Sequence, residues 1–349
     1  MVAAERSPTP GGGPSVCDAL GVPDRGAATP VVTVVVATRN RAHLLRRLVA
    51  GLEAQELADP FEVVLVDDAS TDDTPAVLAD LAASASVPVQ VLRQPRRRGP
   101  GPGRNRGWRA GRAPLVAFTD DDCVPRPGWL AGLVDALRDA DVAQGVTVPA
   151  PDQAHHRGPF SRTLEITSPS PYFETCNMGY RRPLLEELDG FDEAFDRPAG
   201  EDADLGLRAL DGGARLAFAP AAVVEHDVRP ADLRAELRDA WRWQGNVAAI
   251  AKHPSLAEHA HSRRFWKPSH PPTLVALLGL GTAAVLRPRS GVPIAALALT
   301  PYLRHRLRLE PVAVDRAVRL RTLGHAFAVD SAEVLALAWG SVRYRRLFL

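Results

Sequence analysis

The chain reads Leu115-Val116-Ala117-Phe118-Thr119-Asp120-Asp121-Asp122 where a short apolar run meets three consecutive acids. Such a run is typical of a buried strand that carries polar side chains to the carboxyl edge of a sheet. Adjacent carboxylates repel one another, and a hard divalent cation such as Mg²⁺ or Mn²⁺ with oxygen ligands is the usual compensation. A solvated acidic turn is the alternative, because Asp is also common in loops. The triplet alone leaves both interpretations open.

Strands and helices alternate regularly before this triplet. Apolar, β-branched runs at residues 30–37, 61–66 and 87–92 predict strands, and the pattern at residues 42–53 predicts an amphipathic helix. This alternation favours right-handed crossovers and a parallel sheet. Three of the four strands end in polar residues, namely Thr38, Arg39 and Asn40, then Asp67 and Asp68, then Asp120, Asp121 and Asp122. Because parallel strands share their carboxyl edge, we expect these clusters to meet there.

Other polar residues allow a structural and a functional interpretation side by side. We interpret the glycine-rich stretch 99–108 as a flexible loop running into a helix, where Arg104 either faces a diphosphate or pairs with surface acids. The acids Glu201 and Asp202 begin a predicted helix, where the helix dipole alone favours negative charge. His226 follows an apolar strand, and a lone histidine there is more often structural than a ligand.

Length and composition set broad limits. The 349 residues suffice for one large domain with an appendage or for two domains, and 42 basic against 41 acidic residues give no reason to expect nucleic acid as a partner. The three cysteines are far apart and suggest neither a disulfide framework nor a zinc site, so a cytoplasmic location is expected. Residues 1–30 lack the apolar core of a signal peptide, and we interpret them as a flexible leader.

Two apolar runs late in the chain raise the question whether the protein contacts or crosses a membrane. Apolar runs at residues 273–286 and 292–303 are each shorter than the ~20 residues that cross a bilayer. An interfacial or re-entrant hairpin, or a buried helical pair, is therefore favoured over two full spans. A hairpin of the first kind would hold the protein at the inner face of the plasma membrane.

Six stretches together resemble family 2 glycosyltransferases, the inverting enzymes of the GT-A fold that use nucleotide-activated sugars. They lie in the family's order at residues 34–41, 66–72, 103–107, 118–122, 177–182 and 200–205. The resemblance implies an α/β GT-A catalytic domain over residues 31–228, with a Rossmann-like, mostly parallel sheet flanked by helices. By pattern, residues 229–349 form a mainly helical C-terminal extension, whose association with a membrane is left open.

The resemblance also implies a donor site. Its residues would be Thr38, Arg39, Asn40, Asp67, Asp68, Arg104, Asn105, Asp120 and Asp121. Within this set Asp67 or Asp68 would contact the nucleoside, and Thr38 and Arg39 would line the base pocket. The donor would be a nucleotide-sugar.

Metal and catalytic roles follow from the same resemblance. Asp120 and Asp122 match the two acids of the family's D-x-D motif, with Asp122 favoured for direct coordination of Mn²⁺ or Mg²⁺. His226 lies where some members place a third metal ligand. Asp202, the second acid of the pair with Glu201, matches the general base.

We therefore expect metal-dependent, inverting transfer of a single sugar to an acceptor hydroxyl. Residues after His226 show no motif of processive polymer synthases, which favours single transfers. Trp241 and Trp243 are candidates for stacking an acceptor sugar, although buried tryptophans more often serve packing. The acceptor is open between a glycan, a lipid-linked molecule and a small molecule.

Two rival functions remain at the level of sequence. The first is a catalytically inactive GT-A scaffold or binding module, against which the intact Asp120, Asp122 and Asp202 argue. The second is a nucleotidyltransferase, which should carry a glycine-rich loop after the first strand, where this chain has residues 38–41 instead.

Overall fold

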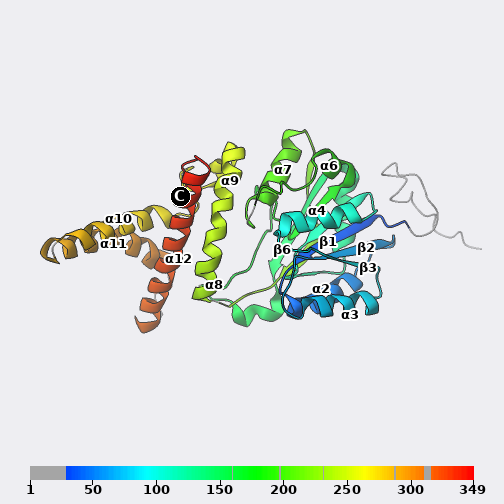
Figure 1. Ribbon diagram of the computed structural model, residues 1–349, viewed down its shortest axis with the longest axis horizontal. Coiled ribbons are helices and arrows are strands. Elements are labelled where there is room, and N and C mark those ends of the chain that lie inside the picture. Colours follow the sequence, from blue (N-terminus) through cyan, green and yellow to red (C-terminus); the bar gives the residue numbers. More distant parts are fainter. Residues whose placement is uncertain (1–28, 159, 196–197, 231, 287, 310–315) are drawn as a thin grey trace, which may run out of the picture.

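The computed structural model describes residues 29–158, 160–195, 198–230, 232–286, 288–309 and 316–349 (Figure 1). Apart from residues 29 and 30, the predicted leader lies outside the described residues. In the described part, strands and helices build one sheet with helices on both faces and a helical region after it. This confirms the predicted fold class.

The sheet is mixed and has the order β3-β2-β1-β4-β7-β6-β8-β5. Its strands are β1 (Val32–Thr38), β2 (Phe61–Asp67), β3 (Val89–Arg93), β4 (Leu115–Thr119), β5 (Cys123–Pro125), β6 (Val142–Pro149), β7 (Asn177–Arg181) and β8 (Leu216–His226). The first four pair in parallel, as the sequence predicts, with β1 between β2 and β4. Beyond β4 the direction changes, because β7 runs antiparallel to both β4 and β6.

Helices cover the two faces of this sheet. They are α2 (Ala42–Glu53), α3 (Thr74–Ser84), α4 (Pro100–Ala110), α5 (Trp129–Asp139), α6 (Arg182–Glu187) and α7 (Glu201–Asp211), with a 3₁₀ turn η1 (Pro151–His156). Alternate residues of β1 serve the two cores: Val34 and Val36 pack with α2, whereas Val35 packs with Trp108 of α4. Both faces of β1 are therefore buried, which explains its continuous apolar sequence.

The glycine-rich stretch 99–108, predicted as a flexible loop running into a helix, is already helical from Pro100 onward. Helix α4 begins at Pro100, directly after Gly99 with its positive φ of 95°. Proline is well tolerated in the first turn of a helix, because the backbone N–H groups there have no carbonyl partner within the helix. A Cβ on Gly107 would lie 2.4 Å from Cγ1 of Val35, so glycine lets this helix approach the sheet closely.

Two further segments differ from the expectation. Residues 177–181, for which no strand is predicted above, form β7 in the middle of the sheet. The apolar runs 215–218 and 222–224, whose pattern predicts two separate short strands, belong to one strand, β8. Its pairing with β6 shifts register at Gly145 and Val146. An irregularity of this kind interrupts the period-two pattern by which strands are recognised in sequence.

The C-terminal part is helical in the residues described. It contains α8 (Leu233–Ala240), η2 (Trp241–Trp243), α9 (Gln244–Lys252), η3 (Pro254–His259), α10 (His270–Val285), α11 (Pro288–Leu309) and α12 (Arg316–Arg343). Helices α10 and α11 lie side by side and project from the body, while α12 returns toward α8 and α9 (Figure 1). Among the helices described, none combines the length and apolar character needed to cross a bilayer.

Candidate active site

The predicted meeting of strand ends is present at the carboxyl edge of the sheet. Thr38, which ends β1, donates a hydrogen bond of 2.7 Å from Oγ1 to Oδ2 of Asp121 beyond the end of β4. The backbone N–H of Asp68, beyond the end of β2, donates to the carbonyl of Thr38 at 2.9 Å. Three segments distant in sequence thus present their polar residues at one place.

Arg104 of α4 joins this edge to the start of α7. Its Nη2 lies 2.7 Å from Oδ1 of Asp120, and its Nη1 lies 3.2 Å from Oδ1 of Asp202 and 3.4 Å from Oε1 of Glu201. The side chain is buried. Burial alone would lower the pKa of the guanidinium, but the charges of Asp202, Asp120 and Glu201 outweigh it and raise that pKa. Arg104 is therefore permanently charged and shared by three carboxylates.

One guanidinium does not neutralise three carboxylates, and burial makes the remaining negative charge unfavourable, which raises the pKa of two of these acids. Burial and the charge of Asp202 raise the pKa of Glu201 to about 7. Burial also raises the pKa of Asp202, and Asp120 adds to that effect while Arg104 opposes it. The Asp202 carboxylate remains 21% exposed and accepts a hydrogen bond from the backbone N–H of Thr175 at 3.1 Å. A carboxyl group so oriented, with a raised pKa and access to solvent, suits proton transfer.

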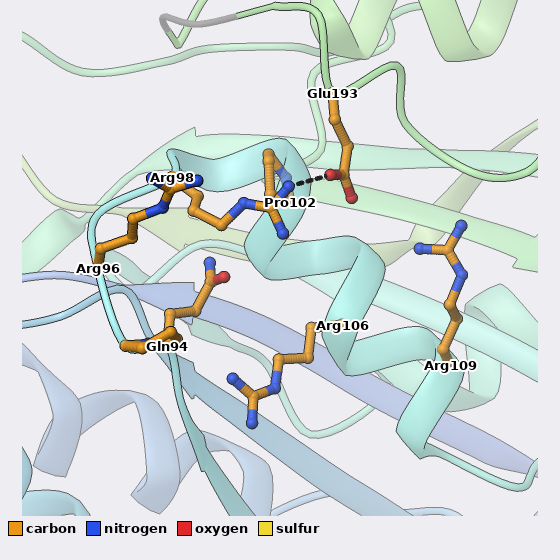
Figure 2. A pocket seen from close by; sticks show the side chains of 8 residues that line it. Gln94, Arg96, Arg98, Pro102, Arg106, Arg109 and Glu193 are labelled. Atoms are coloured by element: carbon orange, nitrogen blue, oxygen red, sulfur yellow. Dashed lines mark hydrogen bonds and ion pairs between the residues drawn. The ribbon is translucent and has the colours of Figure 1, made fainter.

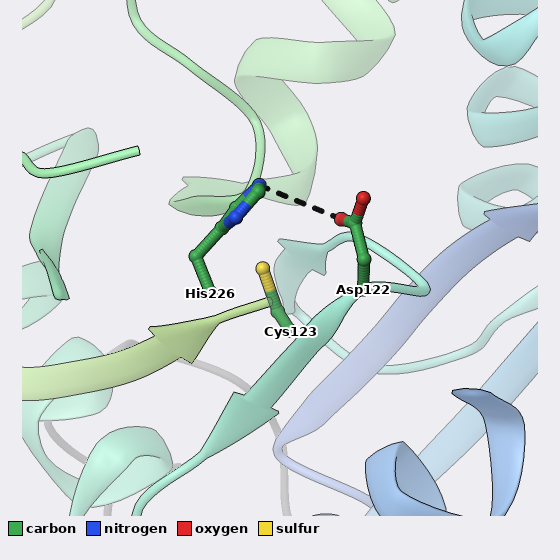
Figure 3. A group of neighbouring side chains, drawn as sticks. All are labelled: Asp122, Cys123 and His226. Atoms are coloured by element: carbon green, nitrogen blue, oxygen red, sulfur yellow. Dashed lines mark ion pairs between the residues drawn. The ribbon is translucent and has the colours of Figure 1, made fainter. Parts of the chain in front are cut away.

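Asp122, Cys123 and His226 form the second part of the site (Figure 3). Oδ1 of Asp122 lies 3.6 Å from Nε2 of His226, and β5 and β8 bring the two together because Cys123 pairs directly with His226. A carboxylate oxygen and an imidazole nitrogen fit a cation such as Mn²⁺. The hydrogen bond with Cys176, together with burial, raises the pKa of the Cys123 thiol, and a protonated thiol is a poor metal ligand.

The two acids of the predicted D-x-D motif point to different partners. Asp120 is paired with Arg104, whereas Asp122 faces His226 and also accepts a 3.1 Å hydrogen bond from Nη2 of Arg229. The structure therefore brings Asp122 and His226 together and does not bring Asp120 into that cluster. Arg229 was missed in the sequence, where no spacing or motif links it to the triplet.

Several residues that are predicted to bind the donor form hydrogen bonds with the backbone of neighbouring loops. Asp68 accepts hydrogen bonds from the backbone N–H groups of Arg98 and Gly99 at 2.7 and 2.9 Å. Asp67 accepts from the N–H of Ser70 at 2.8 Å, and Asn40 Oδ1 accepts from the N–H of Thr71 at 2.8 Å. These contacts shape the rim of the site, and contact with a nucleoside stays a prediction for these residues.

Asn105, Arg39 and the two predicted acceptor tryptophans have varied surroundings. The side-chain amide of Asn105 donates from Nδ2 to the carbonyl of Phe191 at 2.8 Å, and its Oδ1 accepts from the N–H of Phe191 at 2.9 Å. Nε of Arg39 is buried and has no hydrogen-bond partner in the described residues. Trp241 is exposed, whereas the ring of Trp243 packs against that of Trp266 at 5.6 Å. Contact of either ring with an acceptor sugar stays a prediction.

A basic hollow lies beside the start of α4 (Figure 2). Its lining includes Arg96 and Arg98 from the loop after β3 and Arg106 and Arg109 from α4. Arg98 pairs with Glu193, and Arg109 donates to the backbone carbonyl of Asp189 at 3.0 Å. In the sequence, three consecutive basic residues, Arg96, Arg97 and Arg98, mark this region.

Comparison with known proteins gives two matching family profiles. The profile "Glycosyl transferase family 2" matches residues 33–189, and "Glycosyl transferase family group 2" matches residues 115–304. The chain is 33% identical over 247 residues to the pre-mycofactocin glycosyltransferase of Mycobacterium tuberculosis, a match that covers 66% of this chain and 50% of that protein. It is also 33% identical over 228 residues to the succinoglycan biosynthesis protein ExoO of Rhizobium meliloti, covering 60% of this chain and 64% of the relative.

A solved structure shares the fold. The mannosyltransferase PcManGT from Pyrobaculum calidifontis, determined in complex with GDP-Man and Mn²⁺, superimposes with a TM-score of 0.53 at 22% identity. The superposition covers 95% of this chain and 92% of that one. The curated relatives are longer than the part that aligns, since the chain spans 50% of the first and 64% of the second.

Proposed function

Because the chain belongs to glycosyltransferase family 2, we propose that it moves a single sugar from a nucleotide-diphosphate sugar to an acceptor hydroxyl with inversion. The observation that carries this proposal is the position of Arg104. Its guanidinium contacts both Asp120, at the end of β4, and Asp202, at the start of α7. A buried cation beside the candidate base is suited to a reaction that releases a charged diphosphate.

In the proposed reaction Asp202 acts as the base. Its carboxylate accepts the proton of the acceptor hydroxyl while the hydroxyl oxygen attacks the anomeric carbon of the donor sugar. The bond from that carbon to the diphosphate oxygen breaks, and its electron pair leaves with the nucleoside diphosphate. Attack on the face opposite the leaving group inverts the anomeric carbon. Thr175 supports this role, because its backbone N–H orients one carboxylate oxygen of Asp202.

A divalent cation is part of the proposal. Asp122 and His226 would hold it, on the strength of their mutual approach of 3.6 Å and of their donor atoms. When bound, the cation supplies positive charge that stabilises the leaving diphosphate. Thr38 and Arg41 would keep Asp121 at the edge of this site, through a 2.7 Å hydrogen bond and an ion pair of 3.9 Å.

The first experiment identifies the donor. Purified protein is screened by thermal shift against UDP-, GDP- and dTDP-sugars, each with Mn²⁺, Mg²⁺ or EDTA, because a ligand that binds only the native state raises its stability. We expect a metal-dependent shift with one nucleotide. Folded protein that responds to no donor would favour the inactive scaffold instead.

The second experiment tests the base. Asp202→Asn should reduce transfer by about 10² to 10⁴-fold while leaving donor binding intact. Asp211→Asn, on the exposed end of the same helix, is the matched control and should keep its activity. Full turnover by Asp202→Asn would remove Asp202 from the mechanism. The anomeric configuration of the product, read by NMR, tests inversion separately.

We also propose that the hairpin of α10 and α11 docks on an anionic lipid surface. Its apolar side chains face outward, with Leu278 65% and Leu297 75% exposed, and the basic residues Arg304 and Arg308 are exposed near its base. Apolar area with flanking positive charge suits an interfacial contact with acidic lipids. The protein should float with vesicles that contain phosphatidylglycerol and less with neutral ones.

The hairpin contact is tested with paired substitutions. Leu278→Gln and Leu297→Gln together should weaken flotation severalfold, whereas Leu233→Gln on α8, also exposed, should leave it unchanged. Equal flotation of all variants would show that the hairpin does not carry the contact.

A further inference from the structure

Three arginines lie on neighbouring segments beside Asp122. Arg162 and Arg229 face each other across an isolated antiparallel bridge, in which each backbone N–H donates to the other's carbonyl at 2.9 Å. Directly opposite residues in such a pair project their side chains to the same side. Two like charges are thus held together, which is unfavourable unless negative charge compensates them.

Arg242, in the short turn η2, is the third member. Its guanidinium lies 4.8 Å from the ring centroid of Trp243. Burial lowers its pKa, and the positive charges of Arg162 and Arg229 lower it further, against the opposing charges of Asp239 and Glu201. Arg242 follows Asp239, the ion-pair partner of Arg162, by about one helical turn, so the three guanidinium groups come from neighbouring segments.

The acids nearby leave part of this positive charge unmatched. Arg162 pairs with Asp239 at 2.7 Å, and Arg229 donates to Asp122, a carboxylate that also faces His226. Nε of Arg229 is buried without a hydrogen-bond partner in the described residues. For Arg242, the described part of the chain offers its guanidinium no ion pair. Donors and charge thus remain available for an anion.

We infer that Arg162, Arg229 and Arg242 bind a phosphate or diphosphate group carried by the acceptor, an inference that rests on the proposed function of the site. Guanidinium groups form paired hydrogen bonds with phosphate oxygens, and a group with two negative charges matches a cluster of three cations better than a single carboxylate does. The accepting hydroxyl would then lie on the side of Asp202, because Arg229 contacts the acidic triplet at Asp122 and Arg104 joins the same triplet to Asp202. The acceptor class is a phosphorylated glycan or alcohol.

The test measures binding by calorimetry with EDTA present and no donor. The probes are inorganic phosphate, decyl phosphate and the neutral decyl maltoside. Arg162→Gln and Arg242→Gln should raise the Kd for decyl phosphate at least tenfold. Arg238→Gln, an exposed arginine on α8, is the matched control and should bind like the parent protein. Arg242→Lys, which keeps the charge, should recover part of the affinity.

The probes separate the two sources of such an anion. Much tighter binding of decyl phosphate than of inorganic phosphate, with no binding of decyl maltoside, supports a lipid-linked acceptor. Equal binding of the two phosphates supports recognition of the phosphate alone. Parent-like binding by folded Arg162→Gln and Arg242→Gln would overturn the inference. Displacement of decyl phosphate by UDP or GDP with Mn²⁺ would also overturn it, because the arginines would then serve the donor.

This experiment does not depend on catalysis. Asp202→Asn should bind decyl phosphate as the parent protein does. If no donor supports transfer and phosphate binding still follows the three arginines, the proposed function fails and the anion site stands. If transfer occurs and the arginine variants change only the KM for the donor, the proposed function stands and the binding of an acceptor phosphate by these arginines is overturned.

Discussion

At the scale of single residues, Arg104 decides how the acids of the site are arranged. One buried guanidinium serves Asp120 from the sheet and Glu201 and Asp202 from α7. Its position results from α4, which the small residues Gly103 and Gly107 allow to lie against β1. Without this cation, three carboxylates would face one another in a poorly hydrated place.

Arg104→Met should therefore destabilise the protein by about 3 kcal/mol, since removal of one partner leaves buried charges uncompensated. Arg106→Met is the matched control: Arg106 is exposed on the same helix, and its replacement should cost about 0.5 kcal/mol or less. Urea unfolding measures both. Equal stability of the two variants would mean that the carboxylates need no buried cation.

The pH dependence of stability gives a second prediction. The pKa of Glu201 is about 7 in the folded protein, raised first by burial, against 4.5 for an ordinary Glu. Between pH 4.5 and about 7 the folded state holds a proton that the unfolded state has lost. The free energy of unfolding is therefore highest at acid pH and falls as pH rises toward 7. One proton gives a slope of up to about 1.4 kcal/mol per pH unit.

Glu201→Gln should flatten this dependence, because Gln does not titrate. The measurement is the unfolding free energy at intervals between pH 5 and 8, compared with the parent protein. Because Asp202 is strongly linked to Glu201, Asp202→Asn in the same series shows how the proton is divided between them. A slope unchanged by both substitutions would exclude this pair as its source.

At the scale of elements, the hairpin of α10 and α11 depends on a close approach of two helices. A Cβ on Gly279 would lie 2.0 Å from Cβ of Ala298, whereas nothing lies within 4 Å of a Cβ on Gly281. Small residues at such a contact let two helices pack tightly where little else of their surface is buried. Gly279 thus belongs to the interface and Gly281 to the outer face of the same helix.

Gly279→Ala and Gly281→Ala should have opposite effects. The first should cost about 1–3 kcal/mol through overpacking, and the second should stabilise by up to about 1 kcal/mol through helix propensity. Thermal unfolding, with limited proteolysis of the hairpin, distinguishes them. Stabilisation by Gly279→Ala would show that the helices separate easily.

A polar network ties the same region to α12. Asp330 accepts hydrogen bonds from Ser269 at 3.1 Å and from Tyr302 at 2.9 Å, and Lys267 donates to Glu333 at 2.7 Å. Directional bonds of this kind fix how α10, α11 and α12 meet, although much of their apolar surface faces outward.

At the scale of the whole molecule, the helix that carries the candidate base is anchored on the C-terminal region. Asp204 of α7 is fully buried and binds Lys252 at 2.6 Å and His253 at 2.9 Å, both at the end of α9. Burial alone would raise the pKa of Asp204, but these hydrogen bonds lower it below its usual range. The proposed division into a catalytic domain over residues 31–228 and an extension over 229–349 therefore crosses a buried ionic contact.

Asp204→Ala should cost about 3–5 kcal/mol, since it leaves Lys252, His253 and Arg208 around an empty position. Asp211→Ala, exposed on the same helix, is the control. A chain ending at residue 228 should likewise be less stable and lose transfer activity. An active, stable chain of that length would establish the catalytic domain as an independent unit.

The sequence alone determined the layers of this protein and the edge on which its acids lie. Continuous apolar strands such as residues 31–37, and the helical period of residues 42–53, are local patterns that fix element type before any contact forms. Parallel pairing then dictates where Thr38, Asp68 and Asp120 must gather. Asp122, Asp202 and His226 were also singled out, because their surroundings resemble a known family, and their roles stay predictions.

Only the tertiary structure decided which of these side chains lie together. Asp120 turns to Arg104 while Asp122 turns to His226, and Arg229 contacts Asp122 from a segment more than 100 residues further along the chain than the triplet. Such pairings depend on the register of β5 with β8 and on the packing of α4 against the sheet. Both are set by long-range packing, whose geometry leaves no period or spacing in the sequence.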